Sequence, residues 1–314
     1  MTAGLLTALR PADAAARFRR FQKPAASAGL LLVTLIWGSA FVVMKTSMDH
    51  IPPTYLLACR FSVATLGMAA LFFKQLRAVT RSELLGGAAA GVFLFISYYF
   101  QTYGLKYTTA GKNAFITTFY VMIVPFLSWA LTRVRPRARH LAAAFLALAG
   151  LALLSLNGDR TVQSGDVLTL ICSFCFAAHM VLLERITENG NPVRLTAVQM
   201  ASAALCAWVV AAATEGTLDL RIFREAGMFS SILYLGLFSS MLCFLLQTAG
   251  QKYVSASAAS ILLSFESVFG MAFSVLLLDE RLTARMLCGC ALMFAAAVLA
   301  ELTPPGKPDP EKSK

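Results

Sequence analysis

The sequence predicts an all-α integral membrane protein with ten transmembrane helices, arranged as two inverted five-helix repeats. Three observations lead to this expectation. Apolar residues make up 58% of the 314 positions and charged residues only 14%, whereas soluble domains have roughly one-half and one-quarter. Ten apolar runs are long enough to approach the thickness of a bilayer core. A ten-residue segment also occurs twice, which indicates an internal duplication.

The apolar runs are bounded by charged residues or by Pro and Gly, as expected for helices that cross a hydrocarbon core of about 30 Å. We expect them at 28–45, 54–73, 84–104, 113–132, 140–156, 166–183, 195–214, 227–248, 257–278 and 284–301. Outside them lie only short loops and two tails, 1–27 and 303–314. Any function must therefore reside inside the helix bundle.

The basic segment before the first run superficially resembles a secretory signal peptide, with Gly38-Ser39-Ala40 as a cleavage site. A run of about 17 residues exceeds the 7 to 15 residues of a signal core, which favours a retained helix. With the N-terminus inside, most of the Lys and Arg residues behind the net charge of +11 fall in cytoplasmic segments. We therefore expect a multi-pass protein of the cytoplasmic (inner) membrane with both termini in the cytoplasm, and no nucleic-acid partner.

The segment QTYGLKYTTA at 101–110 returns 146 positions later as QTAGQKYVSA at 247–256. This register pairs Tyr120 with Glu266, and an offset of 139 earlier in each half pairs Trp37 with Phe176. The predicted repeats are 28–157 and 165–302. Five spans is an odd number, so the second repeat enters the membrane from the opposite side, as in inverted-repeat secondary transporters.

The repeated segment has a structural interpretation at the corner between two spans. Gly104 and its copy Gly250 would end a helix, and Lys106 would sit at the helix C-terminal dipole and the headgroup level. Gln101 and Gln247, near helix ends, would act as caps. On this interpretation the segment has no contact with a substrate.

Several motifs resemble those of EamA-type transporters of the drug/metabolite transporter superfamily over nearly the whole chain. The matching residues are Leu35-Ile36-Trp37-Gly38-Ser39-Ala40-Phe41 leading to Lys45, Cys59-Arg60-Phe61, the Ala-rich segment before Pro125, Phe265-Glu266, and Asp279-Glu280-Arg281-Leu282-Thr283. The resemblance implies a ten-span carrier of amino acids or other metabolites, often an exporter. The first half departs from the pattern by having Arg135-Pro136-Arg137 at the corner equivalent to the acidic motif.

Ionisable residues inside a span are costly and are functional candidates by default; here they are Arg60, His179 and Glu266. Glu266, near the bilayer centre, could exchange protons or bind a substrate amine, or it could be a structural partner of Arg60, of a Tyr or of a backbone group. Arg60 could bind a substrate carboxylate through two hydrogen bonds, or serve a structural role. His179 could relay protons or contact substrate, or be a hydrogen-bonded core residue.

Neutral residues complete the predicted substrate-binding set. Asn113, Thr117 and Tyr120 form one polar stripe on the fourth span at helical spacing, and Trp37 on the first span could wall an apolar pocket. The alternative for Trp37 is packing against lipid or a neighbouring helix. Spans five and ten are rich in Ala and Gly, so we expect them outside the transport core, where they could form a homodimer interface.

Other classes of protein lack support in the sequence. No phosphate-binding G-x-x-x-x-G-K-[ST] motif is present, and three histidines with Cys172 and Cys175 do not supply a metal site, so we expect no cofactor, no metal and no enzymatic activity. The predicted function is export of a small metabolite by alternating access, most simply an amino acid, with protons as a candidate coupling ion. The alternatives are proton-coupled efflux of cationic drugs and, third, antiport of a phosphorylated metabolite.

Overall fold

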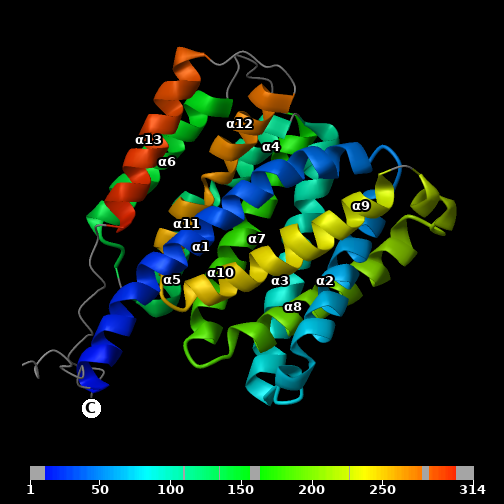
Figure 1. Ribbon diagram of the computed structural model, residues 1–314. Helices are drawn as coiled ribbons and strands as arrows, with labels where there is room; N and C mark the ends of the chain where they lie inside the picture. The colour runs from blue at the N-terminus through cyan, green and yellow to red at the C-terminus, as the bar shows by residue number, and fades with distance from the viewer. Residues whose placement is uncertain are drawn as a thin grey trace, which may run out of the picture.

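The computed structural model describes residues 11–108, 110–133, 135–155, 163–225, 227–277 and 283–301. These residues form helices and connecting turns, with no β-strand among them (Figure 1). The elements are α1 (Pro11–Ser47), α2 (Pro53–Leu76), α3 (Arg81–Tyr107), α4 (Ala110–Thr117), α5 (Tyr120–Thr132), α6 (Ala138–Ser155), α7 (Ser164–Thr187), α8 (Pro192–Thr214), η1 (Leu220–Arg224), α9 (Met228–Leu233), η2 (Tyr234–Leu242), α10 (Cys243–Gln251), α11 (Ala256–Leu263), α12 (Glu266–Leu277) and α13 (Ala284–Glu301). The all-helical prediction is confirmed.

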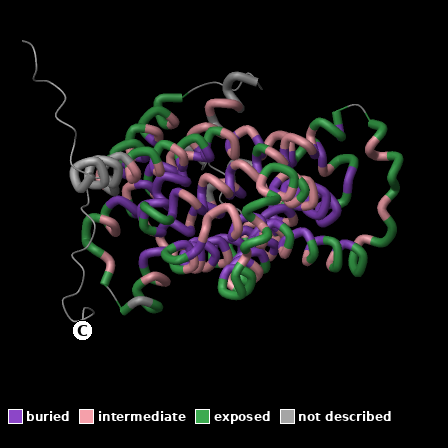
Figure 2. Tube along the Cα trace, turned by 60° about the horizontal axis from the view of Figure 1, so that its bottom comes forward, coloured by how far each residue is buried: buried purple, intermediate pink, exposed green. Residues whose placement is uncertain are grey.

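Among the residues that the structure describes, six helical stretches are long and apolar enough to cross a membrane: Gln22–Ser47 of α1, then α2, α3, α7, α8, and Met228–Gln251, which joins α9, η2 and α10. Shorter apolar helices occupy Tyr120–Leu131, Ala138–Leu153, Ala256–Gly270 and Ala284–Leu299. Exposed residues line the outside of the bundle and buried ones its interior (Figure 2). Large apolar side chains such as Leu205 and Phe294 are among the exposed ones, as expected where the solvent is lipid. The chain is a multi-pass membrane protein.

Two predicted spans, 113–132 and 257–278, are not continuous helices. The first is broken between α4 and α5, and the second between α11 and α12. At each break a backbone N–H bonds three residues back instead of four: Phe119 to Ile116 at 3.1 Å, and Phe265 to Leu262 at 3.2 Å. The prediction of one helix per span is wrong at these two places, because local hydrogen bonding that hydropathy does not register interrupts the helix.

Side-chain hydroxyls contribute to both breaks. Thr118 Oγ1 donates to the carbonyl of Ala114 at 3.0 Å, and Ser264 Oγ donates to the carbonyl of Ile261 at 2.7 Å. Such bonds compete with the backbone ladder and often bend helices. In both helices a hydroxyl at the break bonds to a carbonyl earlier in the same helix, and the two hydroxyl residues are 146 positions apart.

The segment η2 is π-helical and is continuous with α9 and α10. Its wide turn is visible in the bond from Ser240 Oγ to the carbonyl of Leu235, five residues earlier, at 2.8 Å. π-helical turns are rare and occur often at functional sites.

The long helices pack in pairs. Helix α3 lies against α7 and α8, α2 lies against α8, and α1 contacts α10, α11 and α12. Helices α6 and α13 lie side by side at one edge of the molecule (Figure 1). Small residues permit the closest approaches, as at Gly91 of α3, where an added Cβ would meet the carbonyl oxygen of Gln199 on α8.

Two carboxylates tie α2, α3 and α8 together. Helix α2 begins at Pro53 without a capping side chain, and Glu215, at the end of α8, accepts hydrogen bonds from the N–H groups of Thr54 and Tyr55 at 3.0 to 3.1 Å. Glu83 caps α3 and also accepts from Asn191 N at 2.9 Å and Arg194 Nη2 at 2.7 Å, at the start of α8. Each carboxylate satisfies N–H groups that a helix start leaves without intrahelical partners.

We predict that Gly91→Ala destabilises the protein. The added methyl group would also lie 2.6 Å from Ser202 Cβ, so α3 and α8 must separate, at a typical cost of about 1–3 kcal/mol. The control is Gly29→Ala, whose methyl group would meet only Leu246 Cδ2 at 3.8 Å. The thermal unfolding midpoint in detergent should fall for Gly91→Ala alone, and equal midpoints for the two variants would contradict the packing.

Candidate functional site

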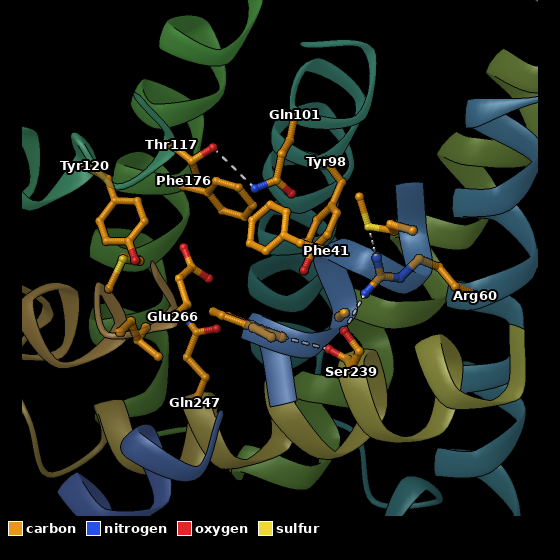
Figure 3. A pocket seen from close by; sticks show the side chains of 15 residues that line it. Phe41, Arg60, Tyr98, Gln101, Thr117, Tyr120, Phe176, Ser239, Gln247 and Glu266 are labelled. Carbon is orange, nitrogen blue, oxygen red and sulfur yellow. Dashed lines mark hydrogen bonds between the residues drawn. The ribbon is translucent and has the colours of Figure 1, made fainter. Parts of the chain in front are cut away.

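A cavity with about 500 Å³ of space free of atoms, its open mouth included, lies inside the bundle. Figure 3 shows the side chains that surround it. Helices α1, α2, α3 and α7 contribute to it, together with η2, α10 and the residues at both helix breaks. The lining residues are Trp37, Ala40, Phe41, Met44, Arg60, Tyr98, Gln101, Thr117, Tyr120, Phe176, Met180, Ser239, Gln247, Leu263 and Glu266.

The two helix breaks place polar groups at the cavity. Tyr120 is the first residue of α5, and Glu266 is the first residue of α12. Glu266 is only 4% exposed, and among the described residues no hydrogen-bond donor reaches its carboxylate. The buried hydroxyl of Tyr120 likewise has no partner in the described part of the chain. Unsatisfied groups of this kind are rare and costly in a protein interior.

Arg60, on α2, is 1% exposed and brings a positive charge to the cavity. Its Nε donates to Ser240 Oγ at 2.9 Å, its Nη2 to Ser239 Oγ at 3.0 Å, and its Nη1 contacts Met44 Sδ at 3.1 Å. The guanidinium carbon also lies 4.6 Å from the ring centroid of Tyr98. All of these neighbours are uncharged, so the guanidinium is held in place without a counter-ion among the described residues.

Aromatic rings form much of the cavity wall. The centroids of Tyr98 and Phe176 are 5.4 Å apart, and those of Tyr120 and Phe176 are 6.5 Å apart. Trp37 donates from Nε1 to the carbonyl of Ser239 at 2.9 Å, so its ring is fixed against η2. These contacts give the cavity a rigid, largely apolar surface between its charged groups.

Five residues of the predicted site line this cavity: Trp37, Arg60, Thr117, Tyr120 and Glu266. The close-up places Arg60 and Glu266 at opposite sides of it, with the Tyr98 side chain between them (Figure 3). The alternative of a structural ion pair between Arg60 and Glu266 finds no support, because the salt bridges of the described residues do not include one.

The other two predicted residues are buried outside the cavity lining. Asn113 donates from Nδ2 to Thr169 Oγ1 at 2.8 Å and to the carbonyl of Gln101 at 3.1 Å. His179 Nε2 lies 3.1 Å from Gln199 Oε1, an arrangement typical of a hydrogen-bonded core histidine. Their roles in substrate binding or proton transfer stay predictions.

Sequence reasoning missed several lining residues, above all Tyr98, Gln101 and Gln247. The two glutamines are not merely helix caps, because both line the cavity, and Gln101 Nε2 donates to Thr117 Oγ1 at 3.4 Å. The sequence did contain a pattern that could have identified them, because each is the first residue of a copy of the repeated ten-residue segment. Tyr98 stands in an apolar run, where nothing in the sequence separates a cavity-facing ring from a lipid-facing one.

Gly104 does not end a helix, contrary to the expectation from its position in the repeated segment. Helix α3 continues to Tyr107, and an added Cβ at Gly104 would meet Thr169 Oγ1 and lie 3.0 Å from the carbonyl oxygen of Gly165. The glycine is required by the close approach of α3 and α7. Of the acidic motif Asp279-Glu280-Arg281-Leu282-Thr283, residues 279–282 lie outside the described residues.

The sequence profile of the EamA-like transporter family matches residues 25–156 and again residues 163–302. The chain belongs to the EamA-like transporter family. An uncharacterized transporter of Archaeoglobus fulgidus is 31% identical over 88% of this chain and 86% of its own length. A protein of Salmonella typhimurium named "Probable amino-acid metabolite efflux pump" is 27% identical over 84% of this chain and 91% of its own.

The fold of this EamA-like protein also has a counterpart of known structure. One protein of known crystal structure superposes on this chain with a TM-score of 0.75 at 17% sequence identity. The match covers 89% of this chain and 97% of the other. At that identity the likeness extends to the fold alone. The family assignment and the membrane-spanning helices identify a transporter.

We predict different effects on stability when two buried carboxylates are removed. Glu266→Gln should leave the unfolding midpoint unchanged or raise it, because it removes a buried charge without a partner. Glu83→Gln should lower the midpoint, because bonds to charged groups contribute about 1.5–3 kcal/mol each and Arg194 loses its partner. Thermal unfolding of the two variants in detergent measures the difference. An equal loss at Glu266 would reveal a structural partner for that carboxylate.

Proposed function

We propose that this protein is a ten-span, inverted-repeat secondary transporter that exports a small metabolite by alternating access, most simply an amino acid or a related compound. Its halves are 28–157 and 165–302, and it resides in the cytoplasmic membrane with both termini in the cytoplasm, as the distribution of Lys and Arg favours. A homodimer through α6 and α13, which lie together at one edge, is part of the same proposal.

Equivalent glycine contacts in the two halves support the repeat. Gly104 approaches Gly165 and Thr169, while its counterpart Gly250 approaches Ala26 and Leu30. Each of these partners differs from its counterpart by 139 positions, the offset of the early part of the repeat. Each contact joins one part of the chain to the other, and the two contacts use residues at equivalent positions, which supports the proposed repeat.

A second pair of contacts supports the repeat and accounts for the π-helical segment. Gly91 approaches Gln199 and Ser202, and Gly236 approaches Arg60 and Val63, again with partners 139 apart. The two glycines differ by 145 positions, whereas Gly104 and Gly250 differ by 146. One extra residue thus lies between Gly236 and Gly250, in the stretch that contains most of η2.

The observation that carries the proposal is the lining of the cavity by residue pairs related through the repeat. Gln101 with Gln247, Thr117 with Leu263 and Tyr120 with Glu266 are 146 apart. Trp37 with Phe176 and Phe41 with Met180 are 139 apart. A site between two repeats, at broken helices, is the arrangement that alternating-access transporters use.

The names of two relatives support the proposed direction and substrate class. The proteins of Salmonella typhimurium and Escherichia coli that carry the efflux-pump name are each 27% identical to this chain. Proton-coupled efflux of cationic drugs is the second candidate, which the buried carboxylate of Glu266 favours. The positive charge of Arg60 on the same cavity disfavours it, because a cation would be repelled there.

We predict that proteoliposomes loaded with a mixed pool of amino acids and other metabolites release selected solutes when they contain this protein. An imposed pH gradient should change the rate if protons are the coupling ion, and Glu266→Gln should abolish that change. Mass spectrometry of the external solution measures the release, and protein-free liposomes give the leakage. Release of no solute by correctly inserted protein would contradict the transport function.

A further inference from the structure

The cavity holds two opposite charges that do not neutralise each other. Arg60 and Glu266 stand at opposite sides, with the ring of Tyr98 between them in the close-up (Figure 3). Arg60 is surrounded by Ser239, Ser240 and Met44, and Glu266 has no hydrogen-bond donor among the described residues. Charges inside a membrane normally pair or face a pathway, so two separate ones indicate a functional role.

Arg60 is organised to accept an anion. A guanidinium carries five N–H groups, more than its three bonds to Ser239, Ser240 and Met44 use. Those bonds, and the ring of Tyr98 at 4.6 Å, fix its orientation. A planar guanidinium held in this way matches the two oxygens of a carboxylate.

Glu266 is organised to accept a cation. Its position at the start of α12 follows from the helix break, and its carboxylate faces the cavity beside Tyr120, whose buried hydroxyl also lacks a partner among the described residues. An ammonium group, with three N–H donors and no acceptor, could bond to both oxygens. The neighbouring aromatic faces would further favour a cation over a neutral group.

We infer, on the basis of the proposed transport function, that the cavity recognises dipolar molecules at both ends, with Arg60 binding the carboxylate and Glu266 the ammonium group. The apolar part of the substrate lies against the aromatic wall. When an amine without a carboxylate binds, the charge of Arg60 stays without a partner. When an acid without an ammonium group binds, the charge of Glu266 stays without a partner. The site therefore selects molecules that carry both charges, such as amino acids, against simple amines and simple acids alike.

Equal pools of three kinds of solute, loaded together into proteoliposomes, test this inference. The pools are free amino acids, their methyl esters, which lack the carboxylate charge, and their N-acetyl derivatives, which lack the ammonium charge. Mass spectrometry follows release, and leakage from protein-free liposomes is subtracted. Wild-type protein should release free amino acids about 10- to 100-fold faster than either derivative, as expected when a charged hydrogen-bonded contact is lost.

Two variants test which residue binds the carboxylate of the substrate and which binds its ammonium group. Glu266→Gln should bring free amino acids down to the rate of N-acetyl derivatives and leave the esters slow. Arg60→Gln should bring free amino acids down to the rate of the esters and leave the N-acetyl derivatives slow. The controls Glu188→Gln and Arg185→Gln remove the same charges from exposed positions and should keep the wild-type order. If Arg60→Gln does not fold, Arg60→Lys, which keeps the charge, should still disfavour the esters.

Several outcomes overturn the inference. If the wild type releases the derivatives as fast as free amino acids, the site does not recognise the two charges of the substrate. Exchanged effects of the two variants would reverse the assignment of the ends. If other metabolites leave but none of the three pools does, the inference fails and the transport function stands. If no solute leaves at all, both fail.

Discussion

The absence of water from the hydrocarbon core is the constraint on which this structure depends, because polar groups there must find partners within the protein. Most do. At the helix ends, Glu215 binds the N–H groups of Thr54 and Tyr55, and Glu83 binds the N–H group of Asn191. Asn113 and His179 are bonded to neighbouring helices. The hydroxyl of Tyr120 has no partner among the described residues, and neither do Gln247 Oε1, Asn113 Oδ1 and His179 Nδ1. The carboxylate of Glu266 lies on the cavity, and no hydrogen bond or salt bridge within the described part of the chain reaches it. Tyr120, Gln247 and Glu266 all line the cavity, so a molecule bound there could supply partners to them.

Two interruptions of helical structure create that place. Each break ends one helix with a residue of the cavity lining, Thr117 or Leu263, and begins the next with another, Tyr120 or Glu266. The hydroxyls of Thr118 and Ser264 bond back to their own helices, so each break is built into the local sequence. In a continuous helix each side chain is rotated by about 100° from the one before it, so neighbouring residues point in different directions. The break allows several neighbouring residues to face the cavity.

The fold class of this protein could be predicted from its sequence. The apolar runs, the placement of Lys and Arg, and the internal duplication are patterns that extend over the whole chain. Arg60 and Glu266 were also predictable, since a charge within an apolar run is costly and seldom persists without a role. The helix breaks were not, because Thr118 and Ser264 look like ordinary small residues in apolar runs. Tyr98 was missed because hydropathy gives a ring the same value whether it faces lipid, a neighbouring helix or a cavity. Asn113 fits the spacing of Thr117 and Tyr120, but it lies one turn before Thr117 on α4, where it bonds to Thr169 and to the carbonyl of Gln101 instead of lining the cavity.

The π-helical turn of η2 has a consequence for Gln247. One residue added to an α-helix would rotate everything after it by about 100°, because the helix has 3.6 residues per turn. Under the proposed repeat, η2 takes up the extra residue in a widened turn, so α10 keeps the rotational phase of the equivalent part of α3. Gln247 therefore still faces the cavity, as Gln101 does from the other half. A duplicated helix can in this way tolerate an insertion without losing its functional face, because the change is confined to the nine residues of η2.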